Sequence, residues 1–590
     1  MEEIKYSEIL KENRRTDDIF AQYKPFRIKV LSNITCNQLR EVGVYYLRNN
    51  GINGQIEIGN YDNIVQDSYR LDGNDLVIIH YDLYPLLDKS VNYVENIPED
   101  EIVNLVGAMK QELDILFENI VKVPAVIFNL FSSGGWAESY PSLSKADKIV
   151  AQLNEYVLSR QPEHVFTISL DKIFQGNGIP ELVDFKMYYL SSTLYSITFW
   201  KKYVSTISAI LLKLTGKVKK AIVFDCDNTL WKGILGEDGE EGIDMNPQSK
   251  IGQIFYKVQQ IAVWLSKAGV LVCLCSKNNE ADVEHILTSH PDMLLKNDHI
   301  IYKKINWQDK VTNIKELADD LNIGVDSMVF VDDSSFEVNL VKEQLPVVKT
   351  FQVPVALHEY PNRLLKFIHQ YFYFSGTKED LAKTRQYKEQ VNRNIEKKKY
   401  NNIEDYLSLL KTEIIVYIDD ISKVSRISQL TQKTNQFNLT TRRYSELQIK
   451  SFMNSASSFV YSFNVSDKFG DNGLTAVCIV QKKTEEVCLI DTFLMSCRIM
   501  GRNIEKKLID YILLDLRRNN IKVIEADYLV TVKNKPVENF LESLGFTLTG
   551  TENGDKHYRL QLANYRYNNI NYIKITENGP DRCENPANHG

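Results

Sequence analysis

The stretch KKAIVFDCDNTLWKGILGEDG, residues 219–239, decides the fold of the central part of the chain. Its apolar run, AIVF, leads directly into D-C-D-N-T, which predicts a buried strand of a parallel sheet that ends at two carboxylates. Where the strand ends and the chain turns, Asp225 and Asp227 can both face one ion. Mg²⁺ prefers this donor type together with substrate phosphate oxygens. The stretch therefore predicts a Mg²⁺ site for a phosphorylated ligand; the alternative is a solvated acidic loop.

Three later segments add polar residues, two of them directly after an apolar run and one at the start of a helical pattern. Ser276 follows VLVCLC, Lys310 lies in NWQDKVTNI, and Asp332 and Asp333 follow SMVFV. The carboxyl ends of parallel strands meet at one edge, where a hydroxyl, an ammonium group and a helix N-terminus can hold phosphoryl oxygens. Taken alone, Ser276 is better explained as a helix cap and Lys310 as a surface lysine. Their order and spacing favour one phosphate site.

As a set, these residues resemble the four motifs of haloacid-dehalogenase (HAD) enzymes: D-x-D-x-T, Ser, Lys and D-D. The resemblance implies that Asp225 is the nucleophile and Asp227 the general acid and base. The residues that it implies for phosphoryl binding are Thr229, Ser276, Asn278 and Lys310. The residues that it implies for Mg²⁺ are Asp225, Asp227 through its backbone, Asp332 and Asp333.

The intervals between the motifs bear on substrate size. HAD enzymes place caps after the first or the second motif, and here the intervals 229–276 and 276–310 leave no room for a large cap domain. An uncovered site admits water, but also something as large as a protein-bound arm.

The residues around the motifs narrow the resemblance to one family of HAD proteins. DCDNTLWKGILGEDG, NWQDKVTNI, VFVDDSSFE and RISQLTQKTNQFNLTTRRYSE together resemble the FkbH-like family of HAD subfamily IIIC, over nearly the whole chain. That resemblance implies a transferase that takes a D-glyceryl group from 1,3-bisphosphoglycerate, removes phosphate, and loads an acyl carrier protein for polyketide assembly. Ser334 and Ser335 replace the asparagine and proline that often follow D-D in the family, and Lys232 replaces a common glycine.

Under this reading Cys226 is a candidate for a transient glyceryl thioester, because a thiolate beside a bound phosphate can accept an acyl group. The alternative is that Cys226 is a small buried apolar residue on the other face of the strand. Two other functions stay open: a plain phosphatase for a small metabolite or polysaccharide precursor, and a carrier-protein scaffold without catalysis.

The first 215 residues alternate strand-like and helical patterns and resemble an SGNH-hydrolase-like α/β domain. Ser32 in VLSNIT lies where the nucleophile of such a hydrolase would sit. No D-x-x-H sequence follows late in the domain, and esterase action needs a histidine base. We therefore expect Ser32 to be a cap or turn residue and the domain to be a structural or docking unit.

Residues 413–565 resemble the GNAT acetyltransferase fold, an α+β arrangement. CRIMGRN, residues 497–503, partly matches the loop that grips a CoA pyrophosphate, and Leu541 lies where these enzymes commonly carry a tyrosine acid. The resemblance implies a pantetheine-binding remnant rather than a second catalyst. Its implied contacts are Arg498, Gly501 and Asn534.

Composition agrees with a multidomain α/β protein. The chain has 590 residues, 44% hydrophobic and 25% charged, and a net charge of −7, so we expect neither nucleic acid nor membrane as a partner. The eight cysteines form no C-x-x-C pair and no secretory signal is seen, which favours the cytoplasm. The domains that we predict are 1–215, 216–377 (the HAD core without a large cap), a charged helical linker at 378–412, 413–565, and a disordered tail at 566–590.

Overall fold

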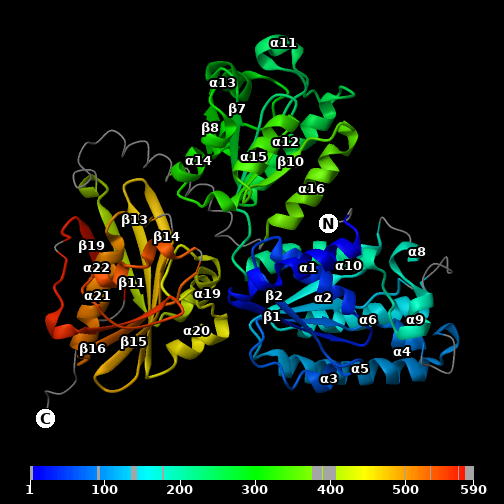
Figure 1. The fold of residues 1–590 in the computed structure, drawn as a ribbon, viewed down its shortest axis with the longest axis horizontal. Helices are drawn as coiled ribbons and strands as arrows, with labels where there is room; N and C mark the ends of the chain where they lie inside the picture. The colour runs from blue at the N-terminus through cyan, green and yellow to red at the C-terminus, as the bar shows by residue number, and fades with distance from the viewer. Residues whose placement is uncertain are drawn as a thin grey trace. The chain divides into compact units, whose positions relative to one another are not determined.

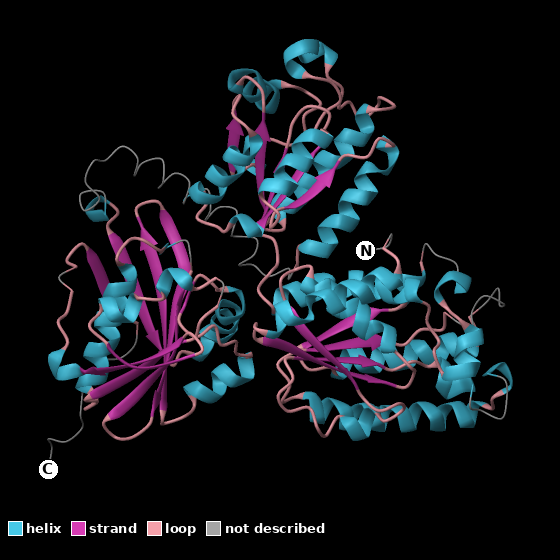
Figure 2. Ribbon diagram, viewed as in Figure 1, coloured by secondary structure: helices cyan, strands magenta, loops and turns pink. Residues whose placement is uncertain are grey.

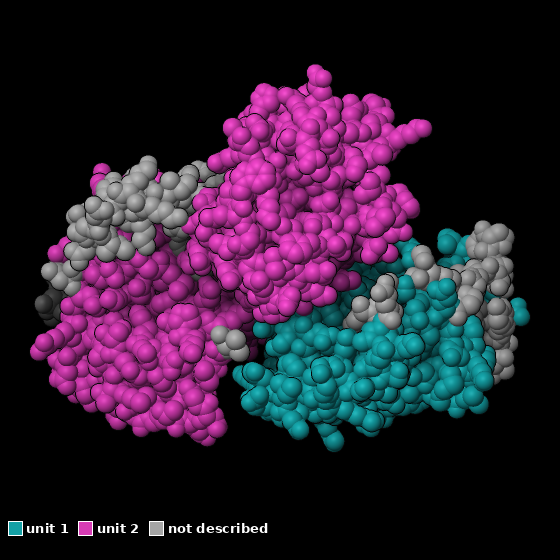
Figure 3. Space-filling model, turned by 45° about the horizontal axis from the view of Figure 1, so that its top comes forward, with its two compact units in different colours: residues 1–217 teal, residues 218–590 magenta. Residues whose placement is uncertain are grey.

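The computed structural model describes residues 4–88, 94–134, 143–175, 179–374, 389, 407–496, 499–531, 533–568 and 570–578. It divides into two compact units, residues 1–217 and 218–590 (Figure 3). Among the described residues, no helix is both long enough and apolar enough to span a bilayer.

Unit 1 is an α/β unit around a parallel sheet of strand order β2-β1-β3-β4-β5. Its strands are β1 (Pro25–Ser32), β2 (Asn53–Ile58), β3 (Leu76–His80), β4 (Val126–Leu130) and β5 (Val165–Ser169). Its helices are α1 (Tyr6–Ala21), α2 (Asn37–Arg48), α3 (Ile64–Asp67), α4 (Tyr84–Asp88), α5 (Glu99–Ile120), α6 (Lys145–Arg160), α7 (Asp171–Phe174), α8 (Ile179–Leu182), α9 (Phe185–Ser191) and α10 (Ile197–Leu214) (Figure 1).

Unit 2 begins with a second parallel sheet, of order β10-β9-β6-β7-β8. The strands are β6 (Ala221–Phe224), β7 (Leu271–Ser276), β8 (Tyr302–Ile305), β9 (Met328–Asp332) and β10 (Lys349–Gln352). The helices are α11 (Leu235–Gly242), α12 (Gly252–Lys267), α13 (Glu280–Ser289), α14 (Lys310–Asp320), α15 (Ser335–Gln344) and α16 (Tyr360–Tyr371).

The central strands of this sheet are apolar up to their carboxyl ends because helices cover both faces (Figure 2). Ile222 and Phe224 of β6 belong to the core on the side of α12 and α16. Ala221 and Val223 belong to the core on the side of α14 and α15. The period of two along a strand thus fills both cores, and the polar residues fall at the strand ends.

The rest of unit 2 is a mostly antiparallel sheet of order β17-β18-β16-β15-β14-β13-β11-β19, with β12 paired to β15. Its strands are β11 (Thr412–Ile418), β12 (Phe437–Asn438), β13 (Ser458–Asp467), β14 (Gly470–Lys482), β15 (Val487–Met495), β16 (Val523–Tyr528), β17 (Thr547–Glu552), β18 (Asp555–Gln561) and β19 (Ile573–Glu577). Its helices are α19 (Val424–Lys433), α20 (Glu446–Met453), α21 (Ile504–Arg518) and α22 (Phe540–Ser543).

The fold class is as predicted, a multidomain α/β protein with two parallel sheets. The predicted linker lies almost entirely outside the described residues. The prediction of a disordered tail from 566 is wrong for Ile573–Glu577, because these residues form β19, which pairs in parallel with β11. Ile573 is buried at this edge of the sheet, which gives the strand an apolar anchor.

Candidate active site

The site lies at the carboxyl ends of β6 and β9, which are neighbours in the sheet. Phe224 of β6 pairs with Val331 of β9, and the N–H of Asp225 donates to the carbonyl of Val331 at 2.9 Å. Asp225 therefore leaves its strand beside Asp332. The topology places the first and fourth motifs next to each other, as expected for parallel strands.

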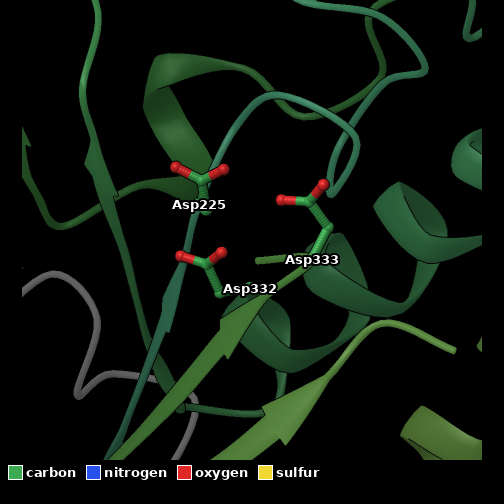
Figure 4. Close-up of side chains that lie close together, drawn as sticks. All are labelled: Asp225, Asp332 and Asp333. Atoms are coloured by element: carbon green, nitrogen blue, oxygen red, sulfur yellow. The ribbon is translucent and has the colours of Figure 1, made fainter. Parts of the chain in front are cut away.

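Three carboxylates converge at this edge. Asp225, Asp332 and Asp333 each offer an oxygen within 4.8 Å of the other two, and Figure 4 shows the three side chains facing a common space. Asp332 is fully buried, Asp225 is 5% exposed, and Asp333 is half-buried. Oxygen donors from separate strand ends at this spacing are arranged to hold a hard divalent cation.

Lys310 is the cation that the structure places against these acids. Its Nζ donates to Asp225 Oδ1 at 2.7 Å and to Asp332 Oδ2 at 2.5 Å. Burial disfavours the ammonium charge, but the two carboxylates outweigh it and raise the pKa of Lys310. Lys310 therefore stays charged, and sequence order alone predicted its place at the start of α14.

The same burial acts on the acids. Burial raises the pKa of Asp225 to about 6, although Lys310 opposes the shift, and the Asp332 charge adds to it. Burial also raises the pKa of Asp332, against the pull of Lys310, and raises that of Asp333 with help from Asp225. A site with one ammonium and three crowded carboxylates lacks positive charge, so a cation that binds here relieves repulsion.

Ser276 and Asn278 lie where the resemblance places phosphate ligands, at the end of β7. The Asn278 amide Nδ2 donates both to Ser276 Oγ at 3.0 Å and to Asp227 Oδ2 at 2.8 Å. Asn278 thus ties the second motif to the first. Thr229 is fully buried, and its Oγ1 makes no hydrogen bond within the described residues. A buried hydroxyl without a partner is a donor available to a ligand oxygen.

The Asp227 carboxylate is fixed by three donors. Oδ1 accepts from Trp231 Nε1 at 2.9 Å and from the N–H of Leu235 at 3.0 Å, while Asn278 serves Oδ2. Its carboxylate lies outside the cluster of three acids, so a metal contact of Asp227 remains a prediction for its backbone carbonyl. Trp231 is fully buried, and the sequence reasoning missed its role. Its position four residues after Asp227 was the available signal.

The surroundings of Cys226 favour the alternative to the thioester hypothesis. Its side chain is fully buried in the apolar core on the α12 side, next to Phe224 and Leu230. Burial, and then the charges of Asp225 and Asp227, raise the pKa of Cys226 well above its ordinary value. The thiolate is therefore disfavoured, and the apolar surroundings fit the alternative, in which Cys226 is a small buried apolar residue.

Ser32 fits the predicted turn residue. It is buried, and its Oγ accepts from the N–H of Ile34 at 3.1 Å. The structure also places His80 of β3 opposite Ser32, which the sequence reasoning missed. Both ring nitrogens of His80 are buried without a hydrogen bond within the described residues, and burial lowers its pKa to about 3. The pair therefore lacks the hydrogen bond that a serine hydrolase requires.

The three residues predicted to contact pantetheine have different surroundings in the structure. Arg498 lies outside the described residues. Gly501 lies exposed in the turn before α21, with a positive φ of 73°. Asn534 is wrong as a ligand contact: it is fully buried, and its amide donates to the carbonyls of Asn438 at 3.0 Å and Leu529 at 2.8 Å. Its Oδ1 accepts from Thr531 N and Tyr528 OH, so its hydrogen bonds are used in holding β12.

Comparison with known proteins shows similarity of fold. No protein-family model and no curated protein matches the chain. A solved structure from Bacteroides fragilis, the N-terminal part of a protein containing a phosphatase domain complexed with Mg, is similar to it. The identity is 24% and the TM-score 0.55, over 63% of this chain and 100% of that chain. The matched 63% of the chain therefore shares the fold of that protein.

Acetyltransferase structures also match, at lower scores. Ard1 from Thermoplasma volcanium is 14% identical with a TM-score of 0.21, over 25% of this chain and 97% of that one. An N-acetyltransferase from Staphylococcus aureus is 17% identical with a TM-score of 0.20, over 26% of this chain and 99% of that one.

Proposed function

We propose that the chain is a Mg²⁺-dependent phosphoryl-transfer enzyme of the HAD type, acting at Asp225. The convergence of Asp225, Asp332 and Asp333 around the Lys310 ammonium carries the proposal. A buried, cation-poor carboxylate cluster at the carboxyl edge of a parallel sheet suits a divalent cation and a phosphate. The Mg²⁺ in the Bacteroides fragilis phosphatase-domain structure supports the choice of cation.

In the proposed reaction, an Asp225 oxygen attacks phosphorus and the bond from phosphorus to the leaving oxygen breaks. Asp227, fixed by Trp231 and Asn278, gives the leaving oxygen its proton. It then takes a proton from the water that cleaves the aspartyl-phosphate, which releases phosphate and restores both acids. Bound Mg²⁺ would supply the positive charge that offsets the phosphoryl oxygens.

Lys310 and the β7 end supply the rest of the phosphoryl pocket. The Lys310 ammonium already spans Asp225 and Asp332, so a phosphoryl group on Asp225 lies within its reach. The unpaired Thr229 Oγ1 and the Ser276 hydroxyl are further donors for phosphoryl oxygens. Such preorganised donors cost no rearrangement during the reaction.

We propose further that the acceptor is an acyl carrier protein and the donor 1,3-bisphosphoglycerate, so that the product is a D-glyceryl thioester. The motif wording and the short intervals between motifs support this choice. Because Cys226 is buried, the acyl group is proposed to pass directly to the carrier's pantetheine thiol. The thiol sulfur attacks the acyl carbon, the bond from that carbon to the C1 phosphate oxygen breaks, and the C1 phosphate leaves with the thiol proton. Asp225 takes the remaining phosphoryl group from the C3 oxygen by the reaction above, Asp227 gives that oxygen its proton, and water then releases the second phosphate.

The test measures phosphate release and carrier mass together. Purified chain is mixed with Mg²⁺, 1,3-bisphosphoglycerate and phosphopantetheinylated carrier protein, beside samples with EDTA and the Asp225→Asn variant. Asp309→Asn is the matched control, because Asp309 caps α14 beside Lys310 without joining the acid cluster.

A glyceryl mass shift on the carrier, dependent on Mg²⁺ and on Asp225, supports the full proposal. Phosphate release without a mass shift supports a plain phosphatase instead. Carrier binding without either reaction, in wild type and Asp225→Asn alike, supports a scaffold and rejects the enzyme.

A further inference from the structure

An exposed tryptophan lies in the loop that leads to Lys310. Trp307, between β8 and α14, has 75% of its surface exposed. Trp200 and Trp231, by contrast, are fully buried, and Trp264 packs against His369 and Phe374. Within the described residues, the Trp307 ring makes no aromatic contact. The exposed indole leaves a large apolar surface in water, which makes Trp307 a candidate contact for a ligand.

The loop that carries Trp307 is held firmly. The Asn306 and Asn313 amides donate to each other's oxygens, at 3.1 and 2.9 Å, and Asn313 is fully buried. The N–H of Gln308 donates to Asn306 Oδ1 at 3.0 Å, and Asp309 caps α14 through the N–H of Thr312 at 2.8 Å. The backbone on both sides of Trp307 is therefore held in place, so that the indole is presented from a fixed point of the loop.

This loop borders the phosphoryl pocket. The N–H of Asn306, next to Trp307, donates to the carbonyl of Ser276 at 3.1 Å. Lys310 follows three residues after Trp307. A second exposed aromatic, Phe336 (68% exposed), lies in the first turn of α15, just after Asp332 and Asp333. Helices α14 and α15 contact each other on the same face of the sheet. Both rings thus belong to the edge at which the acids converge.

We propose that Trp307 is a specificity-determining residue that contacts the organic part of the substrate through a flat face, either an aromatic ring or an amide plane. The proposal rests on the phosphoryl-transfer function above. Of the substrates proposed there, the carrier's pantetheine arm offers flat amide groups, whereas the glyceryl group is compact and aliphatic. The proposal places the group attached to phosphorus toward the loop that carries Trp307, because Asn306 of that loop donates to the carbonyl of Ser276 at the end of β7. Stacking on a rigid indole favours flat groups over compact aliphatic ones.

The test uses phosphonates, which bind as phosphate analogues and are not hydrolysed, so that it does not depend on turnover. Calorimetry in Mg²⁺ compares methylphosphonate with the phenyl, benzyl and 2-phenylethyl members, and N-acetyl-aminoethylphosphonate represents an amide plane. Trp307→Ala is compared with wild type. Trp264→Phe is the matched control, since Trp264 is 38% exposed but lies on α12.

We expect one flat-faced member to bind wild type more tightly than methylphosphonate, and Trp307→Ala to weaken that member about 3- to 10-fold while methylphosphonate changes less than about twofold. Trp264→Phe should leave all affinities unchanged. The phosphonate whose affinity falls in Trp307→Ala shows whether Trp307 contacts an aromatic ring or an amide plane. Equal affinities in wild type, or a preference that survives in Trp307→Ala, overturn the inference alone. If methylphosphonate itself does not bind, the proposed phosphate site is wrong and the inference falls with it.

Discussion

Replacing Asp225 by asparagine should make the metal-free protein more stable above pH 6. The Asp225 carboxylate is 5% exposed, close to Asp332, and has one ammonium partner that it shares. Burial raises its pKa from an ordinary 3.8 to about 6. Asparagine keeps the shape of the side chain and removes the charge, while Lys310 keeps its contact with Asp332.

The direction in which stability changes with pH follows from proton binding. Between pH 3.8 and about 6 the folded chain holds a proton on Asp225 that the unfolded chain has lost, so stability falls as pH rises through this window. Below it the carboxyl is neutral in both states and costs nothing. Above it the full cost is present: a shift of roughly two pKa units corresponds to about 3 kcal/mol. The loss of the Lys310 contact makes this an upper limit for the gain in Asp225→Asn.

Thermal unfolding of the full chain, in EDTA from pH 4 to 8, measures the effect. The relevant transition is the one that Mg²⁺ shifts in wild type, because a cation that binds only the folded state adds about 2.7 kcal/mol at 100 times its Kd. Asp225→Asn should raise this transition at pH 8, converge with wild type near pH 4, and respond less to Mg²⁺. Asp309→Asn serves as control, because hydrogen bonds from Thr312 lower the pKa of Asp309 and its replacement should give no gain at pH 8. An Asp225→Asn variant no more stable than wild type at pH 8 would refute the reasoning.

Three other substitutions test single contacts. Lys310→Met leaves Asp225 and Asp332 without a cation, so we expect unfolding in EDTA to become easier by roughly 3–5 kcal/mol, partly restored by Mg²⁺ in thermal scans, and phosphate release to fall at least about 100-fold. Trp231→Phe replaces the indole by a smaller aromatic ring and removes the N–H that fixes Asp227; kcat should fall about tenfold with KM unchanged, and an equal rise in KM would contradict the positioning role. Cys226→Ala should cost about 1–2 kcal/mol of stability in urea unfolding and leave carrier loading within about twofold, whereas complete loss of loading in folded protein would revive the thioester.

The central fold was predictable because its signal is local. AIVF, LVCLC and MVFV are continuous apolar runs that fit only strands covered on both faces, and each is followed at once by a site residue. Parallel topology then brings the strand ends together without any knowledge of distances. The acids and Lys310 could be grouped from the sequence for this reason.

The contacts that the sequence did not reveal depend on turns and on pairing between distant segments. Trp231 reaches Asp227 only because the chain turns after Asn228, which has a φ of 50°. Asn534 looked like a ligand contact, but it lies 96 residues from its hydrogen-bond partner Asn438. Cys226 lies between two site residues and after the end of β6, yet its side chain belongs to the same core as that of Phe224.

The charge balance of the site bears on the order in which ligands bind, if the proposed function holds. Lys310 is shared between two acids, and Asp333 adds a third carboxylate at the same place. A phosphate dianion that enters this arrangement alone meets net negative charge in a buried setting, where repulsion is strong. The acids must therefore bind their cation before, or together with, the substrate. Phosphonate affinity should then vanish in EDTA and return with Mg²⁺, and it should do so in Trp307→Ala as well, because the Trp307 side chain contributes contact surface and no charge.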